Sequence, residues 1–212
     1  MKRILLSLSL GLFLFTTNAQ EEKDPLAKNI LTELSEKTKT YKSMSIDFKL
    51  TIKSKDINET QVGKAETKGL KFHYNTSDRE VFCDGKTVWS YIEEDNECYI
   101  DEAEEVSDFN PSEIMTIWEK NFKQQYIKEV SQGSNMHEIK LFPSNPSESK
   151  YHTIVLTVDR SKKQIKKVII KTKDGLTLIF SITKFMANSE IADSVFEWKK
   201  AKHPGVTEED NR

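Results

Sequence analysis

The sequence predicts a mainly β protein of the α+β class, built on one large antiparallel sheet with a few short helices. Three observations lead to this prediction. Apolar and polar residues alternate with a period of two along most of the chain, turn signals separate these stretches, and only two short segments have helical periodicity. Strands that follow one another directly favour an antiparallel meander. An open sheet of this size must curl, close or be covered, because it would otherwise expose its apolar face.

The chain begins with the features of a secretory signal peptide. Two basic residues at positions 2 and 3 precede an apolar run that reaches residue 15, and a small-residue cleavage pattern ends at Ala19. The run is shorter than the roughly 20 residues of a transmembrane helix, and no cysteine stands at the cleavage site for a lipid anchor. We therefore expect residues 1–19 to be removed on export and residues 20–212 to form a single domain.

The overall charge is nearly balanced. The chain has 32 Lys and Arg against 34 Asp and Glu, and these residues are mixed along its length. A protein that binds nucleic acid would be expected to concentrate basic residues on one face. We therefore expect no nucleic-acid partner.

The first predicted helix follows Asp24-Pro25, which places a proline near its first turn. Its apolar face comprises Leu26, Ile30, Leu31, Leu34 and Tyr41. The period then changes from 3.6 to 2, and residues 44–53 read as a strand with one apolar and one polar face. Further strands are predicted around residues 61–74, 79–83, 87–92, 97–101, 124–130, 136–142, 153–159, 164–173 and 177–186.

A second helix is predicted over residues 111–122. Asn110 is a favourable N-cap, Pro111 suits the first helical position, and Glu113 suits the third. The apolar residues of this segment that share one face are Ile114, Ile117, Trp118 and Phe122. Such a stripe either completes an ordinary core against the sheet or covers a cavity as a lid.

The sequence lacks the common signatures of catalytic and metal sites. Its four histidines, His73, His137, His152 and His203, lie in different segments, without HExxH or zinc-finger spacing. It has no GxSxG elbow, phosphate-binding loop or dinucleotide fingerprint. We therefore expect neither enzymatic activity nor a metal or other cofactor.

The two cysteines leave two alternatives open. In an oxidising compartment, Cys83 and Cys98 could form a disulfide. However, they fall on the first and third of three consecutive predicted strands, roughly 10 Å apart, whereas a disulfide needs Cα atoms within about 7 Å. Small buried thiols are the other alternative, and the one we favour.

Aromatic residues occur in almost every predicted element. They are compatible with a solid core. They are equally compatible with a cavity enclosed by a curled sheet and two short amphipathic helices.

Several motifs resemble the LolA family, the soluble periplasmic carriers of outer-membrane lipoproteins. Residues 84–91, DGKTVWSY, resemble the family's DGKTLW-x-Y segment. Residues 110–114 resemble the start of its central helix, 141–143 its L-x-P strand end, and 174–196 its closing strands. The likeness runs in the family's order from about residue 27 to 206. Where the family commonly has an Arg-Pro pair, thought to hold the lid, followed by F-x-W, this chain has KG at 68–69 and FHY at 72–74.

The resemblance implies an incomplete antiparallel β-barrel, with short helices as a lid over a hydrophobic cavity that holds the acyl chains of triacylated lipoproteins. The acyl-chain contacts predicted on this basis are Phe48, Leu50, Phe72, Tyr74, Trp89, Tyr91, Ile114, Ile117, Trp118, Phe142, Phe180 and Ile182.

The resemblance further implies a monomeric periplasmic carrier in a Gram-negative bacterium. It would accept lipoproteins from an inner-membrane LolCDE-type ABC transporter and deliver them to the outer membrane, whether or not a separate receptor takes them there. Two other classes remain open. One is a periplasmic lipid- or lipoprotein-sensing regulatory protein on the same half-barrel fold, and the other is a general binder of hydrophobic small molecules.

Overall fold

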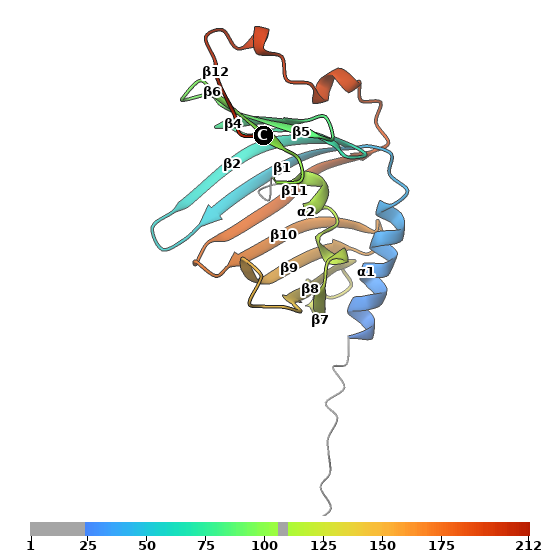
Figure 1. The fold of residues 1–212 in the computed structure, drawn as a ribbon. Coiled ribbons are helices and arrows are strands. Elements are labelled where there is room, and N and C mark those ends of the chain that lie inside the picture. The colour runs from blue at the N-terminus through green and yellow to red at the C-terminus, as the bar shows by residue number, and fades with distance from the viewer. Residues whose placement is uncertain (1–23, 106–109) are drawn as a thin grey trace, which may run out of the picture.

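One twelve-stranded sheet forms the body of the molecule. The computed structural model describes residues 24–105 and 110–212, so the predicted signal peptide lies outside the described residues. Figure 1 shows the sheet bending into an open half-barrel. The predicted class, mainly β with a curled antiparallel sheet and a few short helices, is confirmed.

Two antiparallel meanders make up the sheet. The first contains β1 (Met44–Lys53), β2 (Asn58–Lys68), β3 (Lys71–Asn75), β4 (Arg79–Cys83), β5 (Thr87–Ile92) and β6 (Glu97–Glu102). The second contains β7 (Phe122–Glu129), β8 (Met136–Pro143), β9 (Tyr151–Asp159), β10 (Gln164–Thr172) and β11 (Thr177–Ala187). β1 pairs antiparallel with β11 and joins the meanders, while β12 (Thr207–Asp210) pairs parallel with β6. The sheet stays open because its two edge strands, β7 and β12, do not pair with each other.

Two strand predictions need correction. The segment predicted around residues 61–74 is divided into β2 and β3 by a turn at Gly69, whose φ of 62° is a left-handed conformation that glycine adopts without strain. β12 is an additional strand in the charged tail that the sequence did not predict. Its pairing depends on the partner strand β6, which lies more than a hundred residues earlier in the chain.

Helix α1 (Pro25–Thr38) begins as predicted, although Tyr41 lies beyond its end. One Asp24 carboxylate oxygen accepts hydrogen bonds from the Leu26 and Ala27 amides at 3.0 and 3.2 Å, and the other accepts one from the Tyr126 amide of β7 at 2.8 Å. The N-cap therefore also ties the helix to an edge strand. Among the described helices, none combines the length and apolar character needed to cross a bilayer.

The second predicted helix is shorter than expected. α2 covers only Pro111–Ile114, a 3₁₀ turn (η1) covers Ile117–Glu119, and Phe122 already belongs to β7. The Thr116 hydroxyl donates to the Ser112 carbonyl at 2.9 Å, a local bond that competes with helix continuation. The Asn110 side chain caps α2 as predicted, accepting a hydrogen bond from the Ser112 amide at 2.9 Å.

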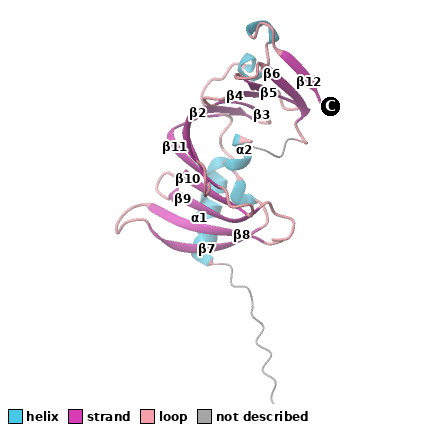
Figure 2. Ribbon diagram, turned by 90° about the vertical axis from the view of Figure 1, so that its left-hand side faces the viewer, coloured by secondary structure: helices cyan, strands magenta, loops and turns pink. Residues whose placement is uncertain are grey.

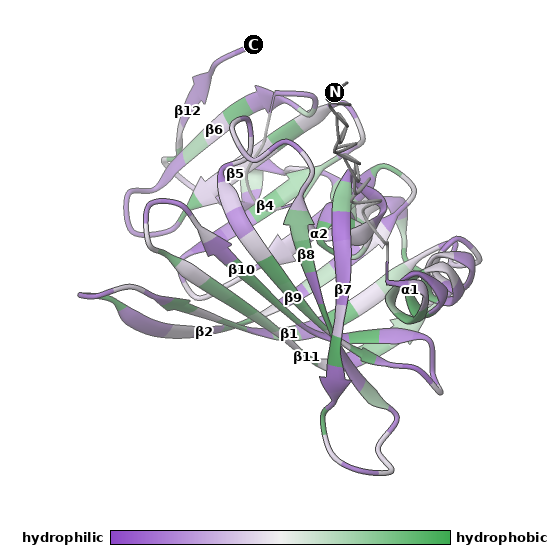
Figure 3. Cartoon of the chain, turned by 90° about the horizontal axis from the view of Figure 1, so that it is seen from below, coloured by the Kyte–Doolittle hydropathy of each residue, from purple (hydrophilic) through white to green (hydrophobic). Residues whose placement is uncertain are grey.

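The main core lies on the concave, inner face of the sheet. Figures 1 and 2 show α1 and α2 inside the bend, whereas the C-terminal segment crosses the outer face of the first meander. Viewed from below, hydrophobic and hydrophilic residues alternate along the strands of the second meander (Figure 3), as expected for a sheet with one buried face. Buried side chains at the centre of this inner core include Ile139, Leu141, Ile154, Leu156 and Val168.

Candidate functional site

An apolar cavity lies beneath α2, between the lid segment and the centre of the sheet. We use the term lid segment for residues 110–119, which contain α2 and η1. The residues that line the cavity are Ile46, Phe48, Ala65, Pro111, Ile114, Met115, Val168, Phe180 and Ile182. Its volume is about 30 Å³, room for only a few water molecules, since one needs roughly 10–15 Å³ of such space. The lid segment therefore nearly fills the concave face in this state.

A larger groove adjoins this cavity at the side of the lid segment. Its volume is about 350 Å³, and it shares Ile114 and Phe180 with the cavity. Its other apolar lining residues are Ile117, Tyr151, Ile170 and Leu178, and its polar lining residues are Asn110, Glu113, Lys120, Lys150 and Thr172. An apolar interior with a few polar groups at the rim is the usual character of a site for a hydrophobic ligand.

Phe48 is placed in the cavity by its two neighbouring strands. The β1–β11 register shifts between Asp47 and Phe48, and on the other side Phe48 pairs with Gly63 of β2. A Cβ atom on Gly63 would come within 2.5 Å of the Phe48 ring. The ring therefore occupies space that only glycine leaves open, and its centroid lies 6.5 Å from that of Phe180.

The lid segment is anchored to α1. The Trp118 indole donates a hydrogen bond to the Ser35 hydroxyl at 2.7 Å, and Trp118 is only 3% exposed. Lys39, just after α1, forms an ion pair with Glu119 at 3.5 Å. The ion pair is solvent-exposed and contributes little, so the buried indole is the stronger of these two anchors. This contact gives Trp118 a structural role in holding the lid in place.

The structure brings most of the predicted site residues together on the inner face. The predicted contacts that lie in the inner core or pack against it are Phe48, Leu50, Phe72, Tyr74, Ile114, Ile117, Trp118, Phe180 and Ile182. Of these, Phe48, Ile114, Phe180 and Ile182 line the cavity, and Ile117 lines the adjoining groove.

Three predicted contacts point to the outer face of the sheet instead. Val88 of β5 belongs to the inner core, so its neighbours Trp89 and Tyr91 point to the outer face. Likewise, Leu141 of β8 is in the inner core and Phe142 points outward. An aromatic side chain in a strand does not itself indicate which face is covered, and a shift of one residue reverses the assignment.

The sequence analysis also missed five residues that line the cavity: Ile46, Ala65, Pro111, Met115 and Val168. Two of them, Ile46 and Ala65, lie where the predicted strand alternation and the strand pairing would place cavity residues. Ile46 lies two residues from Phe48 and therefore on the same face of β1, and the β1–β2 register places Ala65 directly opposite Ile46. Most of the predicted contacts were aromatic residues, whereas a cavity also requires small side chains such as Ala65 where the lid segment approaches the sheet.

The outer face of the first meander carries a second, aromatic cluster beneath the C-terminal segment. We call Phe82, Tyr91, Trp198 and His203 the outer aromatic cluster. The Trp198 ring centroid lies 4.2 Å from that of His203, 5.6 Å from Tyr91 and 5.7 Å from Phe82. The Trp198 indole donates to Glu208 of β12 at 2.8 Å. This cluster fixes the C-terminal segment on the sheet, which accounts for the outward direction of Tyr91.

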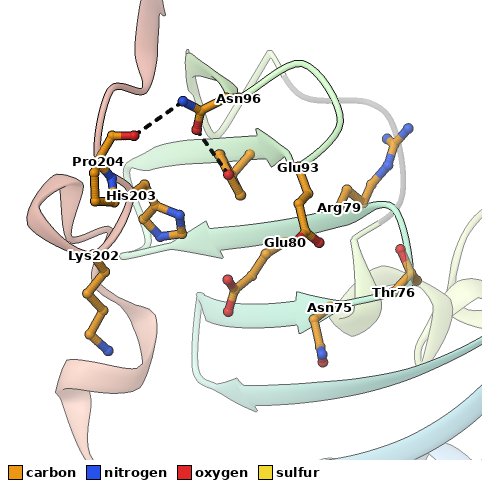
Figure 4. Close-up of a pocket in the computed structure, with 10 residues that line it drawn as sticks. Asn75, Thr76, Arg79, Glu80, Glu93, Asn96, Lys202, His203 and Pro204 are labelled. Atoms are coloured by element: carbon orange, nitrogen blue, oxygen red, sulfur yellow. Dashed lines mark hydrogen bonds between the residues drawn. The ribbon is translucent and has the colours of Figure 1, made fainter.

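A polar pocket of about 630 Å³ lies next to this cluster (Figure 4). Its charged lining residues include Arg79, Glu80, Glu93 and Lys202. The Tyr91 hydroxyl donates to Asn96 at 3.1 Å, and Asn96 donates to the Pro204 carbonyl at 3.4 Å. Although this pocket is larger than the inner cavity, its charged lining is unsuited to an acyl chain.

Comparisons with known proteins identify the family. The family model described as outer membrane lipoprotein carrier protein LolA matches residues 39–199. The chain belongs to the LolA family.

Individual relatives of this LolA-family chain are distant in sequence. An outer-membrane lipoprotein carrier protein of Coxiella burnetii is 20% identical over 203 residues, covering 94% of this chain and 95% of the relative. Among solved structures, an uncharacterized conserved protein of Thermus thermophilus has a TM-score of 0.58 at 9% identity and covers 88% of this chain and 99% of its own. LprF of Mycobacterium bovis has a TM-score of 0.50 at 12% identity, with coverages of 80% and 97%. At these identities the structural matches support the fold alone.

One departure from the LolA-family pattern has a clear structural result. Lys68, at the position where the family commonly has the Arg-Pro pair, donates to Asp193 at 2.8 Å and to the Ile191 carbonyl at 3.2 Å. Lys71 also contacts Asp193, at 3.2 Å. These bonds hold the C-terminal segment on the outer face. In the described part of this LolA-family chain, Lys68 forms no hydrogen bond or ion pair with the lid segment. The lid segment is anchored instead by the hydrogen bond from Trp118 to Ser35.

Both cysteines are free and buried. Cys83 belongs to the inner core and Cys98 to a small cluster on the outer face with Ile100 and Val206, so β5 separates them. Burial raises the pKa of both thiols, and that of Cys98 to about 12. The buried-thiol alternative is therefore the one that the structure supports.

Proposed function

We propose that this protein is a periplasmic lipoprotein carrier that holds the acyl chains of triacylated lipoproteins on the inner face of its half-barrel. The observation that carries this proposal is the apolar cavity and its adjoining groove beneath a separate lid segment. Membership of the LolA family and the Coxiella burnetii relative named as an outer-membrane lipoprotein carrier protein support it.

The energetics explain why such a carrier needs an enclosed site. An acyl chain of about 15 methylenes, at ~0.8 kcal/mol each, resists exposure to water by on the order of 12 kcal/mol. Several such chains on one lipoprotein could not cross an aqueous compartment unaided. A lining of aliphatic and aromatic side chains offsets this cost without directional bonds that would have to break on release.

The volumes indicate that the lid segment must move when cargo enters. A cavity of about 30 Å³ cannot hold an acyl chain, whereas the adjoining groove of about 350 Å³ is already open at the rim. We propose that acyl chains enter through this groove and displace Ile114 and Met115, which occupy the concave face when cargo is absent. The side chains that replace water around the acyl chains are then Phe48, Leu50, Phe72, Tyr74, Ile114, Ile117, Trp118, Phe180 and Ile182.

In this role the mature protein acts as a monomer between two membranes. It accepts cargo from an inner-membrane LolCDE-type ABC transporter and delivers it to the outer membrane, with or without a receptor. Loading depends on the differential affinity of the open and closed lid states for acyl chains. No step of this cycle requires catalysis by the carrier itself.

The decisive experiment is a release assay. The mature protein is incubated with spheroplasts that synthesise a labelled triacylated lipoprotein, and label is counted in the soluble fraction. We expect release as a one-to-one complex. Retention of label on the membrane, while a known carrier releases it in parallel, contradicts the carrier role and favours a lipid-sensing regulatory protein on the same fold.

A matched pair of variants locates the site in the same assay. Ile182→Asp places a charge in the cavity, whereas Ile57→Asp makes the same change at the β1–β2 turn, where Ile57 is 40% exposed. We expect Ile182→Asp to abolish release and Ile57→Asp to retain it, with circular dichroism confirming that both variants fold. Wild-type release by Ile182→Asp would remove the cavity from the cargo site.

A further inference from the structure

The outer face of the second meander is open to solvent and chemically distinctive. In the described part of the chain, both helices lie inside the bend and the C-terminal segment covers only the first meander (Figures 1 and 2). The strand registers place Val155, Ile169 and Ile179 side by side across β9, β10 and β11 on this outer face. Each is partly exposed. They form a continuous apolar row, which we call the outer apolar row.

Lysines flank this row on both sides. On one side, Lys167 of β10 pairs with Ser181 of β11, which pairs with Lys49 of β1. On the other side, Lys171 pairs with Thr177. Lys140 of β8 pairs with Val155 and so continues the apolar row at its end. Because strand residues alternate, all four lysines point to the same face as the apolar row.

These lysines carry unneutralised charge. Among the described residues, none of Lys49, Lys140, Lys167 and Lys171 takes part in an ion pair. Between β7 and β8, by contrast, Lys128 lies 3.8 Å from Glu138. Asp47 and Glu138 share this outer face, two residues from Lys49 and Lys140, but in the described part of the chain neither forms an ion pair with these lysines. The centre of the face therefore has positive charges around an apolar strip that are not neutralised by ion pairs.

The opposite end of the sheet is acidic. The acidic residues on β5, β6 and β12 and in the turns next to them include Glu93, Glu94, Asp95, Glu97, Asp101, Glu102, Glu104, Glu105, Glu208, Glu209 and Asp210. The chain as a whole has a formal net charge of only −2. Most of these acidic residues fall within one stretch of the sequence, residues 93–105, and the pairing of β12 with β6 adds Glu208, Glu209 and Asp210 to them. The molecule therefore has a basic outer face on the second meander and an acidic end at β6 and β12.

We propose that the outer face of the second meander docks on an anionic lipid surface through Lys49, Lys140, Lys167, Lys171 and the outer apolar row. Lysine side chains lie along apolar groups with their stems while the ammonium groups reach lipid phosphates. Each lysine near an anionic membrane surface adds to the attraction. The acidic end is repelled by the same surface, so the molecule is oriented with its basic face toward the membrane. The four lysines lie on three strands, β1, β8 and β10, around the outer apolar row. Charges dispersed in this way fit a fluid lipid surface and do not require a partner of complementary shape.

This docking leaves the inner cavity and the lid segment free, because they lie on the other face of the sheet. The inference does not depend on the carrier role. It adds a second lipid-directed surface that recognises head groups, whereas the cavity recognises acyl chains. A carrier held in this way would remain near a membrane between loading and delivery.

The test uses cosedimentation of the mature protein with vesicles at low salt. One set of vesicles contains phosphatidylglycerol and phosphatidylcholine in equal parts, and the other contains phosphatidylcholine alone. We expect binding to the anionic vesicles only, with release as salt screens the charges. Equal binding to both sets would indicate lipid uptake by the cavity and overturn the proposal, as would no binding to the anionic vesicles.

Two double variants with the same change in net charge sharpen the result. Lys167→Glu with Lys171→Glu reverses charge on the proposed face, whereas Lys28→Glu with Lys86→Glu reverses it at exposed positions on α1 and the β4–β5 turn. We expect the first pair to lower vesicle partitioning by at least about tenfold and the second to leave it near the wild-type value. Equal losses in both pairs would show a general charge effect and contradict a defined face. Binding to an acidic protein surface but not to vesicles would reassign the face to a protein partner.

Discussion

The inner and outer faces of the sheet bury their side chains in different ways. The inner face packs aliphatic and aromatic residues from both meanders against α1 and the lid segment. The outer face buries a smaller aromatic cluster, only on the first meander, beneath a C-terminal segment held by ion pairs and ring contacts. The inner covering is therefore mainly apolar, whereas the outer covering also depends on specific polar contacts.

The largest expected contrast comes from neighbouring residues on β8. Leu141 is fully buried on the inner face and Phe142 points outward. Leu141→Ala should cost about 2–5 kcal/mol of unfolding free energy because it leaves a cavity in a packed core. Phe142→Ala should cost less than about 1 kcal/mol, as is usual for a surface substitution. Urea unfolding of both variants measures the difference, and equal losses would contradict the assignment of faces.

Gly63→Ala should disrupt the packing of the inner face where Gly63 lies against the Phe48 ring. The added methyl group would meet the Phe48 ring and the Asn75 carbonyl oxygen at 2.5 Å each. Displacement of the ring or of β3 should cost about 1–3 kcal/mol, the usual range for overpacking. The control is Val62→Ala at the adjacent position, which is 68% exposed. A Gly63→Ala protein as stable as this control would show that Phe48 moves freely within the cavity.

Trp198→Ala should loosen the outer covering without affecting the inner core. It removes ring contacts to Phe82, Tyr91 and His203 and the hydrogen bond to Glu208. We expect a cost of about 1–2 kcal/mol, since aromatic pairs contribute roughly 0.5–1.5 kcal/mol each and the side chain is partly exposed. Hydrogen exchange should accelerate over residues 193–210 and remain slow in β8–β10. Uniform acceleration would show that the two faces unfold together.

The smallest expected effect is a pH dependence of the outer covering. The hydrogen bond from His73 to Glu80, at 2.8 Å, holds the pKa of Glu80 below its ordinary value of 4.5, and the charges of His203 and Lys202 act in the same direction. Because the pKa of this carboxyl group is lower in the folded state, its charged form stabilises the folded protein above pH 4.5. This stabilisation is lost as the pH falls through the pKa of Glu80 in the folded state.

This pH dependence is tested by hydrogen exchange of residues 193–210 between neutral pH and pH below 4.5. The wild-type segment should lose protection, after correction for intrinsic exchange rates, as the carboxylate is protonated. Glu80→Gln should show less protection at neutral pH and a smaller change on acidification. An identical pH profile in Glu80→Gln would exclude Glu80 as the source of the acid sensitivity and leave the other carboxyl groups of the segment whose pKa is lowered, Asp193, Glu208 and Asp210.

Much of the fold was predictable because local signals agreed with it. Pro25 correctly marked the start of α1, and alternation located most strands to within a few residues. The second helix was predicted too long, because periodicity could not show that Trp118 would bond to α1 and that Phe122 would pair within the sheet. The cavity was only partly predicted, since Pro111 and Met115 of the lid segment meet Val168 of β10 there, an approach that depends on the tertiary fold.

The sequence by itself determined the class of fold, the positions of most turns and the family resemblance, because strand alternation and turn chemistry are local properties of the chain. Only the tertiary structure decided which alternate residues face inward, since both faces of β5 are apolar and both are covered. It also decided how charges separate across strands, because it gathers the lysines of β1, β8 and β10 on one outer face and adds the acidic residues of β12 to those of β6. That separation depends on which strands become neighbours, and long-range pairing such as that of β1 with β11 sets those neighbours.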